Sequence, residues 1–446
     1  MTYNYKNKGI KLGSKTTRIA AFSVATAVLM GTVTAVFAEG NNEISYTDGE
    51  YSLEQDHDYP ACNSEDDNHT TPEGDYEYTD ESETSGDAGK EGQESDQGTE
   101  PDYDGEENYE PDEEEYDEEK EDELYPLPEF SSSIRVINDV WIEDITVEFG
   151  ETVRIVDGGS LTGTIFVNAG GELHLEDGGA INGTVILNGF GALLEMNGGV
   201  ISGQGRGVQV EFGARFNKNG GTVSGNIADN GGGVLVSGAG SVFTMTDGTI
   251  VDNTATGATG SIGGGIKVTD GATFNLHGGV IEGNTAQSGG GVALTFGSTL
   301  NMTGGLISGN DSVSLGAGVR VSSSTFAMSG GEISHNAGNG VHLNDINPTF
   351  EMTGGTIANN EGRGVAAATI GSMMAMSGGT ISNNNDGGVQ VAGIFNMFGS
   401  ALIDGNRALT GAGVNLVGES ATFNMNGGVV QNNTSVHGDD IFMPGV

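Results

Sequence analysis

From residue 131 onward, short runs of alternating apolar and small polar residues are separated by glycines. The stretch "FAMSGGEISHN" (326–336) shows the pattern: Phe326 and Met328 are two residues apart, a Gly pair follows, and then come Ile333 and Asn336. Residues two apart lie on the same face of a β-strand. The hydrophobic period therefore predicts strands, with Phe and Met on the buried side and glycines at the corners.

This pattern recurs in twelve copies, spaced 20 to 31 residues apart, counting a degenerate copy near Ala401. An aliphatic residue follows the Gly pair by two positions in every copy, and Asn follows it by five positions in nine copies. The Asn positions are Asn226, Asn253, Asn284, Asn310, Asn336, Asn360, Asn384, Asn406 and Asn433. A third strand begins with glycines, as in "GGGVLV" (231–236) and "GAGVRV" (316–321).

Each copy thus supplies three short strands, which cannot enclose a core alone but can when copies stack. We expect an all-β, parallel β-solenoid of about twelve coils over residues 131–446. Phe and Met columns should stack inside it, and the Asn side chains should pair between successive coils. The insertion "TATGATGSIGGG" (254–265) is interpreted as a flexible corner, although longer coils there would also suit the wall of a cleft.

The region before the repeats predicts two further segments. Residues 1–38 have a basic start, an apolar run and small residues ending at Ala38, which is typical of a secretory signal peptide; an uncleaved membrane anchor is the alternative. Residues 39–130 hold 37 of the 63 Asp and Glu with only two lysines, so we expect a disordered acidic linker. The mature chain should carry no transmembrane span.

Charge and cysteine content exclude several functions. The repeat region has nine basic residues against 26 acidic ones, which argues against nucleic-acid binding. Cys62 is the single cysteine, so no intramolecular disulfide can form. "PDYDGEENYE" (101–110) resembles the start of a calcium loop but lacks its completed ligand spacing, and we predict neither a metal site nor a cofactor.

Candidate binding residues lie at outward positions of the third strand, where no carboxylate occurs. Arg320 and His342 fall on consecutive coils, with Asn344 on the same side, and could bind an acidic sugar. The alternative is that they are solvated polar residues that discourage edge pairing. The full set of candidate ligand-binding residues is Lys267, Arg320, His342, Asn344, Gln390 and Asn415.

Catalytic residues are not predicted. Glu195 and Glu351 lie on outward positions of the Phe/Met strand many coils apart, whereas a glycosidase needs two carboxylates within about 5–10 Å. A Thr-rich face would favour ice binding, but only Thr244-Met245-Thr246 has that form.

The motifs "F-x-M-x-G-G-x-I-x-x-N" and "G-G-G-V-x-V" resemble those of right-handed parallel β-helix proteins of the pectate-lyase-like superfamily, above all adhesin-like bacterial surface proteins. The resemblance implies a right-handed parallel β-helix in a secreted or cell-surface protein that binds host or microbial glycans without catalysis. The long basic start of residues 1–38 looks like a Gram-positive export signal. The same superfamily includes polysaccharide lyases and glycoside hydrolases, which is the alternative. "ITVEFGETVRI" (145–155) looks like the family's first coil, and Trp141 is placed to cover its apolar end.

Overall fold

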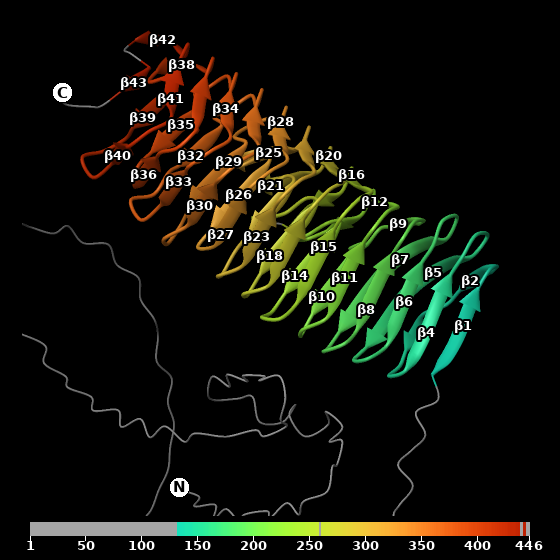
Figure 1. Cartoon of the computed structure of the whole chain (residues 1–446). Coiled ribbons are helices and arrows are strands. Elements are labelled where there is room, and N and C mark those ends of the chain that lie inside the picture. The colour runs from blue at the N-terminus through green and yellow to red at the C-terminus, as the bar shows by residue number, and fades with distance from the viewer. Residues whose placement is uncertain (1–131, 258–259, 438–439, 443–446) are drawn as a thin grey trace, which may run out of the picture. The chain divides into compact units, whose positions relative to one another are not determined.

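The computed structural model describes residues 132–257, 260–437 and 440–442, so the predicted signal peptide and acidic linker lie outside the described residues. The described residues form 43 strands and no helix, wound into a rod of stacked coils (Figure 1). In these ranges, no helix has the length and hydrophobicity that a membrane span requires.

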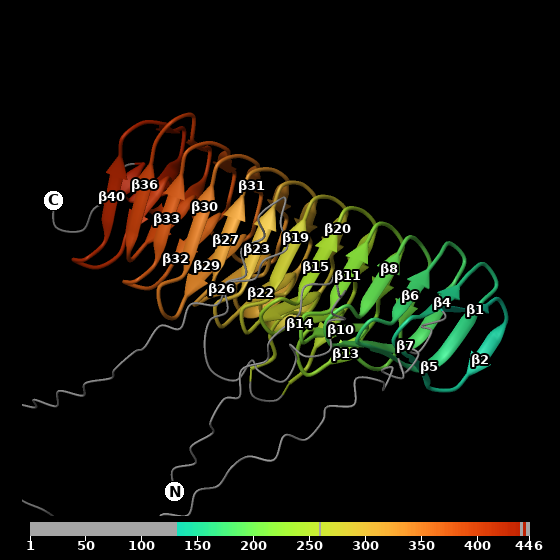
Figure 2. The same ribbon diagram turned by 60° about the horizontal axis from the view of Figure 1, so that its bottom comes forward.

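One face of the rod, here the FxM face, is a 13-stranded parallel sheet built from the Phe/Met strands (Figure 2). Its strands are β1 (Ser133–Ile137), β4 (Glu151–Ile155), β6 (Glu172–Leu175), β8 (Leu193–Met196), β11 (Arg215–Lys218), β15 (Val242–Met245), β19 (Thr273–Leu276), β23 (Thr299–Met302), β27 (Thr325–Met328), β30 (Thr349–Met352), β33 (Met373–Met376), β36 (Ile394–Met397) and β40 (Thr422–Met425).

The other two faces belong to one 24-stranded sheet, because β5 (Ser160–Asn168) and β7 (Ala180–Asn188) run through both of them. The GGxI face holds β2 (Val140–Ile142), β9 (Val200–Ser202), β12 (Thr222–Ser224), β16 (Thr249–Val251), β20 (Val280–Glu282), β24 (Leu306–Ser308), β28 (Glu332–Ser334), β31 (Thr356–Ala358), β34 (Thr380–Ser382), β37 (Leu402–Asp404) and β41 (Val429–Gln431). The GVxV face holds β3 (Ile145–Val147), β10 (Val208–Glu211), β14 (Val234–Ser237), β18 (Ile266–Thr269), β22 (Val292–Leu294), β26 (Val319–Ser322), β29 (Val341–Asn344), β32 (Val365–Ala367), β35 (Val389–Val391), β39 (Val414–Leu416) and β43 (Ile441–Phe442).

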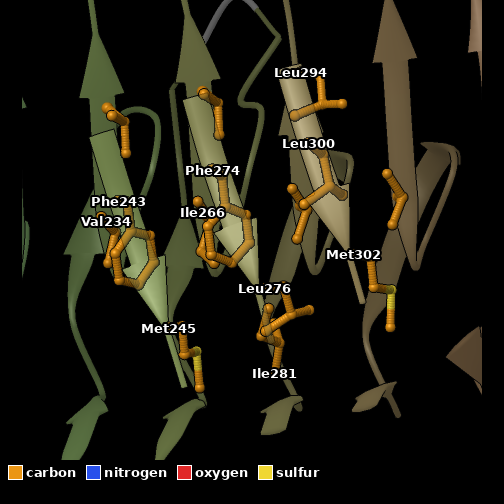
Figure 3. Close-up of a cluster of buried hydrophobic side chains, with 14 of the residues drawn as sticks. Val234, Phe243, Met245, Ile266, Phe274, Leu276, Ile281, Leu294, Leu300 and Met302 are labelled. Atoms are coloured by element: carbon orange, nitrogen blue, oxygen red, sulfur yellow. The ribbon is translucent and has the colours of Figure 1, made fainter. Parts of the chain in front are cut away.

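The interior consists of the predicted columns. Phe216, Phe243 and Phe274 are fully buried and stack with ring centroids 4.6 and 4.7 Å apart. Figure 3 shows how Leu300 continues the Phe column in the next coil. Because parallel strands lie about 4.8 Å apart, identical residues in register bring identical side chains into contact along the rod.

The Met column contains one residue that the sequence prediction passed over. Lys218 stands in register between Met196 and Met245, with no exposed surface. Its Nζ donates to the carbonyl oxygens of Gly220 and Gly221. Burial lowers the pKa of Lys218 to about 7, although the charge of Asp247 opposes the shift.

The Asn column forms a continuous buried ladder, as predicted. Each Nδ2 donates to Oδ1 of the Asn in the next coil over 2.9–3.1 Å, from Asn226 through to Asn433. Each amide also donates to the carbonyl of the aliphatic residue one coil earlier, as Asn310 does to Ile281. At the ladder's start, Oδ1 of Asn226 is buried without a hydrogen-bond partner among the described residues.

Two local expectations were wrong. Residues 145–155 are not the first coil, because β1 and β2 precede β3, and β4 pairs with β1 as the start of the next coil. Trp141 does lie in the first coil, on β2, where it pairs in register with Leu161 and packs against the core as expected. The insertion at 254–265 is not simply a corner: its first residues form β17 (Thr254–Ala255) in a small parallel sheet with β13 (Ile227–Ala228), β21 (Thr285–Ser288) and β25 (Asp311–Leu315). A separate two-stranded parallel sheet, β38 (Arg407–Thr410) and β42 (Thr434–His437), forms in the last coils.

Candidate ligand-binding face

The outward side of the GVxV face is partly covered by backbone, at the glycines that lead into its strands. Gly231 and Gly263 have φ of 58° and 71°, and a Cβ on either would lie 3.2 or 2.9 Å from Cβ of Lys267. Only glycine allows the chain to turn this closely over its own sheet. The middle side chain of each strand is therefore covered at its base and reaches solvent only by its end.

Arg320 and Lys267 lie in the same row, two coils apart. Nε of Arg320 donates to Oδ1 of Asn344 over 3.2 Å, and its Nη2 lies 3.3 Å from Oδ2 of Asp345. Burial lowers the pKa of Lys267, with the carboxylate of Asp270 opposing and the charges of Arg206 and Arg320 adding to the shift. The cations of alternate coils thus influence each other along this face.

His342 does not face solvent as predicted. It aligns with Arg320 but is only 7% exposed, because Gly316 of the preceding coil lies against its Cβ. Asn339 Nδ2 lies 3.0 Å from its Nδ1. Burial, together with the charges of Arg320 and Arg363, lowers the pKa of His342 to about 4, so the ring is neutral at pH 7.

The remaining candidates fall into two groups. Asn344 is also nearly buried and positions Arg320. Gln390 and Asn415 are partly exposed neighbours on β35 and β39, but the buried Ala366 separates them from His342. The structure therefore brings together Arg320, His342 and Asn344. Lys267 is separated from Arg320 by the buried Ala293, and Gln390 and Asn415 form a separate polar pair.

Sequence reasoning missed two cations of this face. Arg206 and Arg363 precede β10 and β32, each in an "RGV" triplet that was a usable signal. Arg206 donates to Gln209 and to the carbonyl of Asn230, and Arg363 lies 2.9 Å from Asp386. Arg206, Lys267, Arg320 and Arg363 then occupy every second coil, which spaces them roughly 10 Å apart. We call these four residues the cationic row.

The FxM face carries a different charged group near its first coils. Arg154, His174 and Glu195 are adjacent in register. Nη2 of Arg154 lies 2.7 Å from Glu176, and Nε2 of His174 lies 3.3 Å from Glu172. Burial raises the pKa of Glu176, but hydrogen bonds from Asn197 and Arg154 outweigh it and hold the pKa below its usual value.

The carboxylates of Glu172 and Glu176 thus contact neighbouring side chains. Glu195 likewise accepts hydrogen bonds from the side-chain amides of Asn217 and Asn219. Among the residues that the structure describes, no group of three or more His, Cys, Asp and Glu could hold a metal ion.

A shallow hollow of about 240 Å³ lies farther along the FxM face, where Ala327 separates Asn301 from Glu351. Glu351 is the one carboxylate in its lining, and the other polar residues are Asn301 and three residues with hydroxyl groups, Thr303, Ser329 and Thr353. The hollow therefore lacks the carboxylate pair that glycoside hydrolysis requires.

Comparison with known proteins agrees with the coil geometry. Residues 212–372 match the family model described as right handed beta helix region. Among solved structures, the crystal structure of a TibC-catalysed hyper-glycosylated TibA fragment aligns with 66% of this chain and 97% of its own, at 14% identity and a TM-score of 0.20. No curated protein matches the sequence. The family match and the three parallel faces show that the described residues form a right-handed parallel β-helix.

Proposed function

We propose that the chain is a secreted or surface-displayed, adhesin-like binding protein whose GVxV face binds an acidic glycan without cleaving it. The observation that carries this proposal is the cationic row. Four of the nine basic residues of the acidic repeat region occur on one face in alternate coils. A regular row of basic side chains along the rod fits an extended polyanion better than a compact ligand, and such a ligand would compete with the carboxylates beside each cation, such as Asp345 and Asp386.

The cations retain donors for a ligand. Arg320 uses Nε and Nη2 in its contacts with Asn344 and Asp345, which leaves Nη1 without a protein partner among the described residues. A guanidinium has five N–H donors and binds carboxylate or sulfate through two of them. Partial burial strengthens such a contact, because the local dielectric is lower than in water.

The alternative function is cleavage of a polysaccharide, as a lyase or a hydrolase. One assay separates the two: the protein is incubated with acidic and neutral polysaccharides, with and without calcium, and retained binding and new reducing or unsaturated ends are recorded together. We expect binding of acidic polysaccharides, weakened by salt, with no new ends.

Variants assign the binding to this face. Arg320→Gln and Arg363→Gln should each weaken binding roughly tenfold, since a hydrogen bond to a charged group contributes about 1.5–3 kcal/mol. Arg154→Gln is the matched control: it removes an ion-paired arginine from the FxM face and should leave binding unchanged. Cleavage products, or equal loss in all three variants, would contradict the proposal.

A further inference from the structure

The corner that joins the GVxV face to the FxM face adopts the same backbone turn in several coils. Both central residues have positive φ in Phe212-Gly213 (56° and 82°), Asp270-Gly271 (57° and 76°) and Phe296-Gly297 (51° and 73°). Turns of this kind favour Asn, Asp or Gly at the first central position, because other side chains are strained in the left-handed region. Asp270 obeys that rule, whereas Phe212 and Phe296 do not.

The two phenylalanines are also exposed. Phe212 is 69% and Phe296 is 70% accessible, so neither ring contributes appreciably to the core. Phe190, Ile346 and Ile370 are exposed in the same corner of other coils. A residue that is strained and leaves its apolar surface in water is unfavourable for folding on both counts. Strain of this kind is typical of functional positions.

The corner adjoins the cationic row. Nη2 of Arg320 reaches Asp345, which is itself a corner residue with φ of 67°, and Lys267 interacts with Asp270 of the corner in its own coil. Phe212 directly follows β10, and Phe296 lies one coil before Arg320. The corner that bears the exposed rings is therefore the corner whose carboxylates interact with Lys267 and Arg320.

We propose that Phe212 and Phe296 are stacking platforms for sugar rings of an acidic glycan held by the cationic row. A pyranose ring has an apolar C–H face that packs on an aromatic ring, while its carboxylate or sulfate groups project from the rim toward cations. Since three coils separate the two phenylalanines, their rings are roughly 14 Å apart along the rod. A ligand spanning both is thus an oligosaccharide of several units lying along the rod axis, with Lys267 between the two rings.

This inference rests on the proposed function and gives the ligand a second requirement besides charge. A fully flexible or compact polyanion such as inorganic polyphosphate satisfies the cationic row alone. An acidic glycan satisfies both the row and the rings. The other possible occupant of an exposed apolar corner, a second copy of this chain, is distinguished by the test.

The test uses Phe212→Asn, Phe296→Asn and the double variant in the full chain. Asn tolerates positive φ, so each substitution removes the ring and relieves the turn. We expect roughly tenfold weaker binding of heparin and hyaluronan oligosaccharides per ring, with a thermal midpoint that is unchanged or higher. Polyphosphate binding should stay within twofold of the parent. Phe212→Trp and Phe296→Trp keep an aromatic ring and should bind glycan as the parent does. Phe398→Ala, which removes an exposed ring at a different corner, should have no effect.

The outcomes separate this inference from the proposed function. Suppose that the parent binds acidic glycans and that Arg320→Gln weakens this binding. If the Phe→Asn variants then bind as the parent does, the stacking inference is wrong and the proposed function stands. If the variants instead lower self-association measured by analytical ultracentrifugation without changing glycan binding, the corner is a contact between copies. If the parent binds no acidic glycan, both proposals fail.

Discussion

Replacement of Lys218 by Met should stabilise the protein. Lys218 is fully buried at a position that Met196 and Met245 occupy in the adjoining coils, so the new side chain matches the column. A pKa that falls from 10.5 to about 7 corresponds to roughly 4–5 kcal/mol against the charged form. The variant loses the hydrogen bonds to Gly220 and Gly221, which offsets part of that gain. We expect a net gain of about 2–3 kcal/mol at pH 6.

The pH dependence follows from the same shift. Between pH 7 and about 10, the unfolded chain keeps its lysine proton while the folded chain has lost it. Because the unfolded state then binds more protons, the contribution of Lys218 to the free energy of unfolding rises with pH across this window and is constant below it. The advantage of the Lys218→Met variant should therefore be largest at pH 6 and shrink toward pH 10.

Urea unfolding of parent and variant at pH 6, 8 and 10 measures the effect as a difference, which cancels the titration of other groups. Lys267→Met, at a half-buried surface lysine, is the control and should change stability by much less. A variant that is less stable than the parent at pH 6, or a difference that does not vary with pH, would refute this account of Lys218.

Three further changes test the packing of the rod by urea or thermal unfolding. Asn310→Ala should cost about 3–5 kcal/mol, since Nδ2 and the backbone N of Asn284 lose their acceptor and the carbonyl of Ile281 loses its donor; a cost below 1 kcal/mol would mean that the ladder adds little. Phe243→Ala, in the middle of a three-ring stack, should lower the free energy of unfolding by about 3–5 kcal/mol. A loss of about 0.5 kcal/mol or less, as at an exposed position, would contradict this packing. Gly331→Ala should cost at least about 1–2 kcal/mol, because φ is 83° and a Cβ would lie 2.6 Å from Cε of Met302; an unchanged midpoint would exclude this strain.

The fold could be predicted because the same short-range signals recur in every coil. Alternation of Phe and Met at a spacing of two fixes which side of a strand is buried, and stacking coils in register then places Asn beside Asn. The strands of the insertion were not foreseen, because β17 contains only Thr254 and Ala255 and pairs solely with its counterparts in neighbouring coils.

The candidate site was predicted less completely, because it depends on contacts between coils. The alternating strand pattern predicts that His342 faces solvent, but the side chain is covered by Gly316, which leads into the neighbouring strand β26 of the preceding coil. Arg206 and Arg363 join the cationic row from turns rather than from the strand position that the prediction considered. Lys218 was missed because its copy, "RFNKNGG" (215–221), departs from the Phe/Met pattern.

Hydrogen–deuterium exchange with and without a bound acidic oligosaccharide tests the central claim most directly, since it locates the ligand on the rod. We predict protection of the turns beside the cationic row, at 204–214, 269–272, 295–298 and 322–324, with the FxM face unchanged. Protection concentrated instead on the FxM face around Glu195 or Glu351, or at no defined position, would contradict the account.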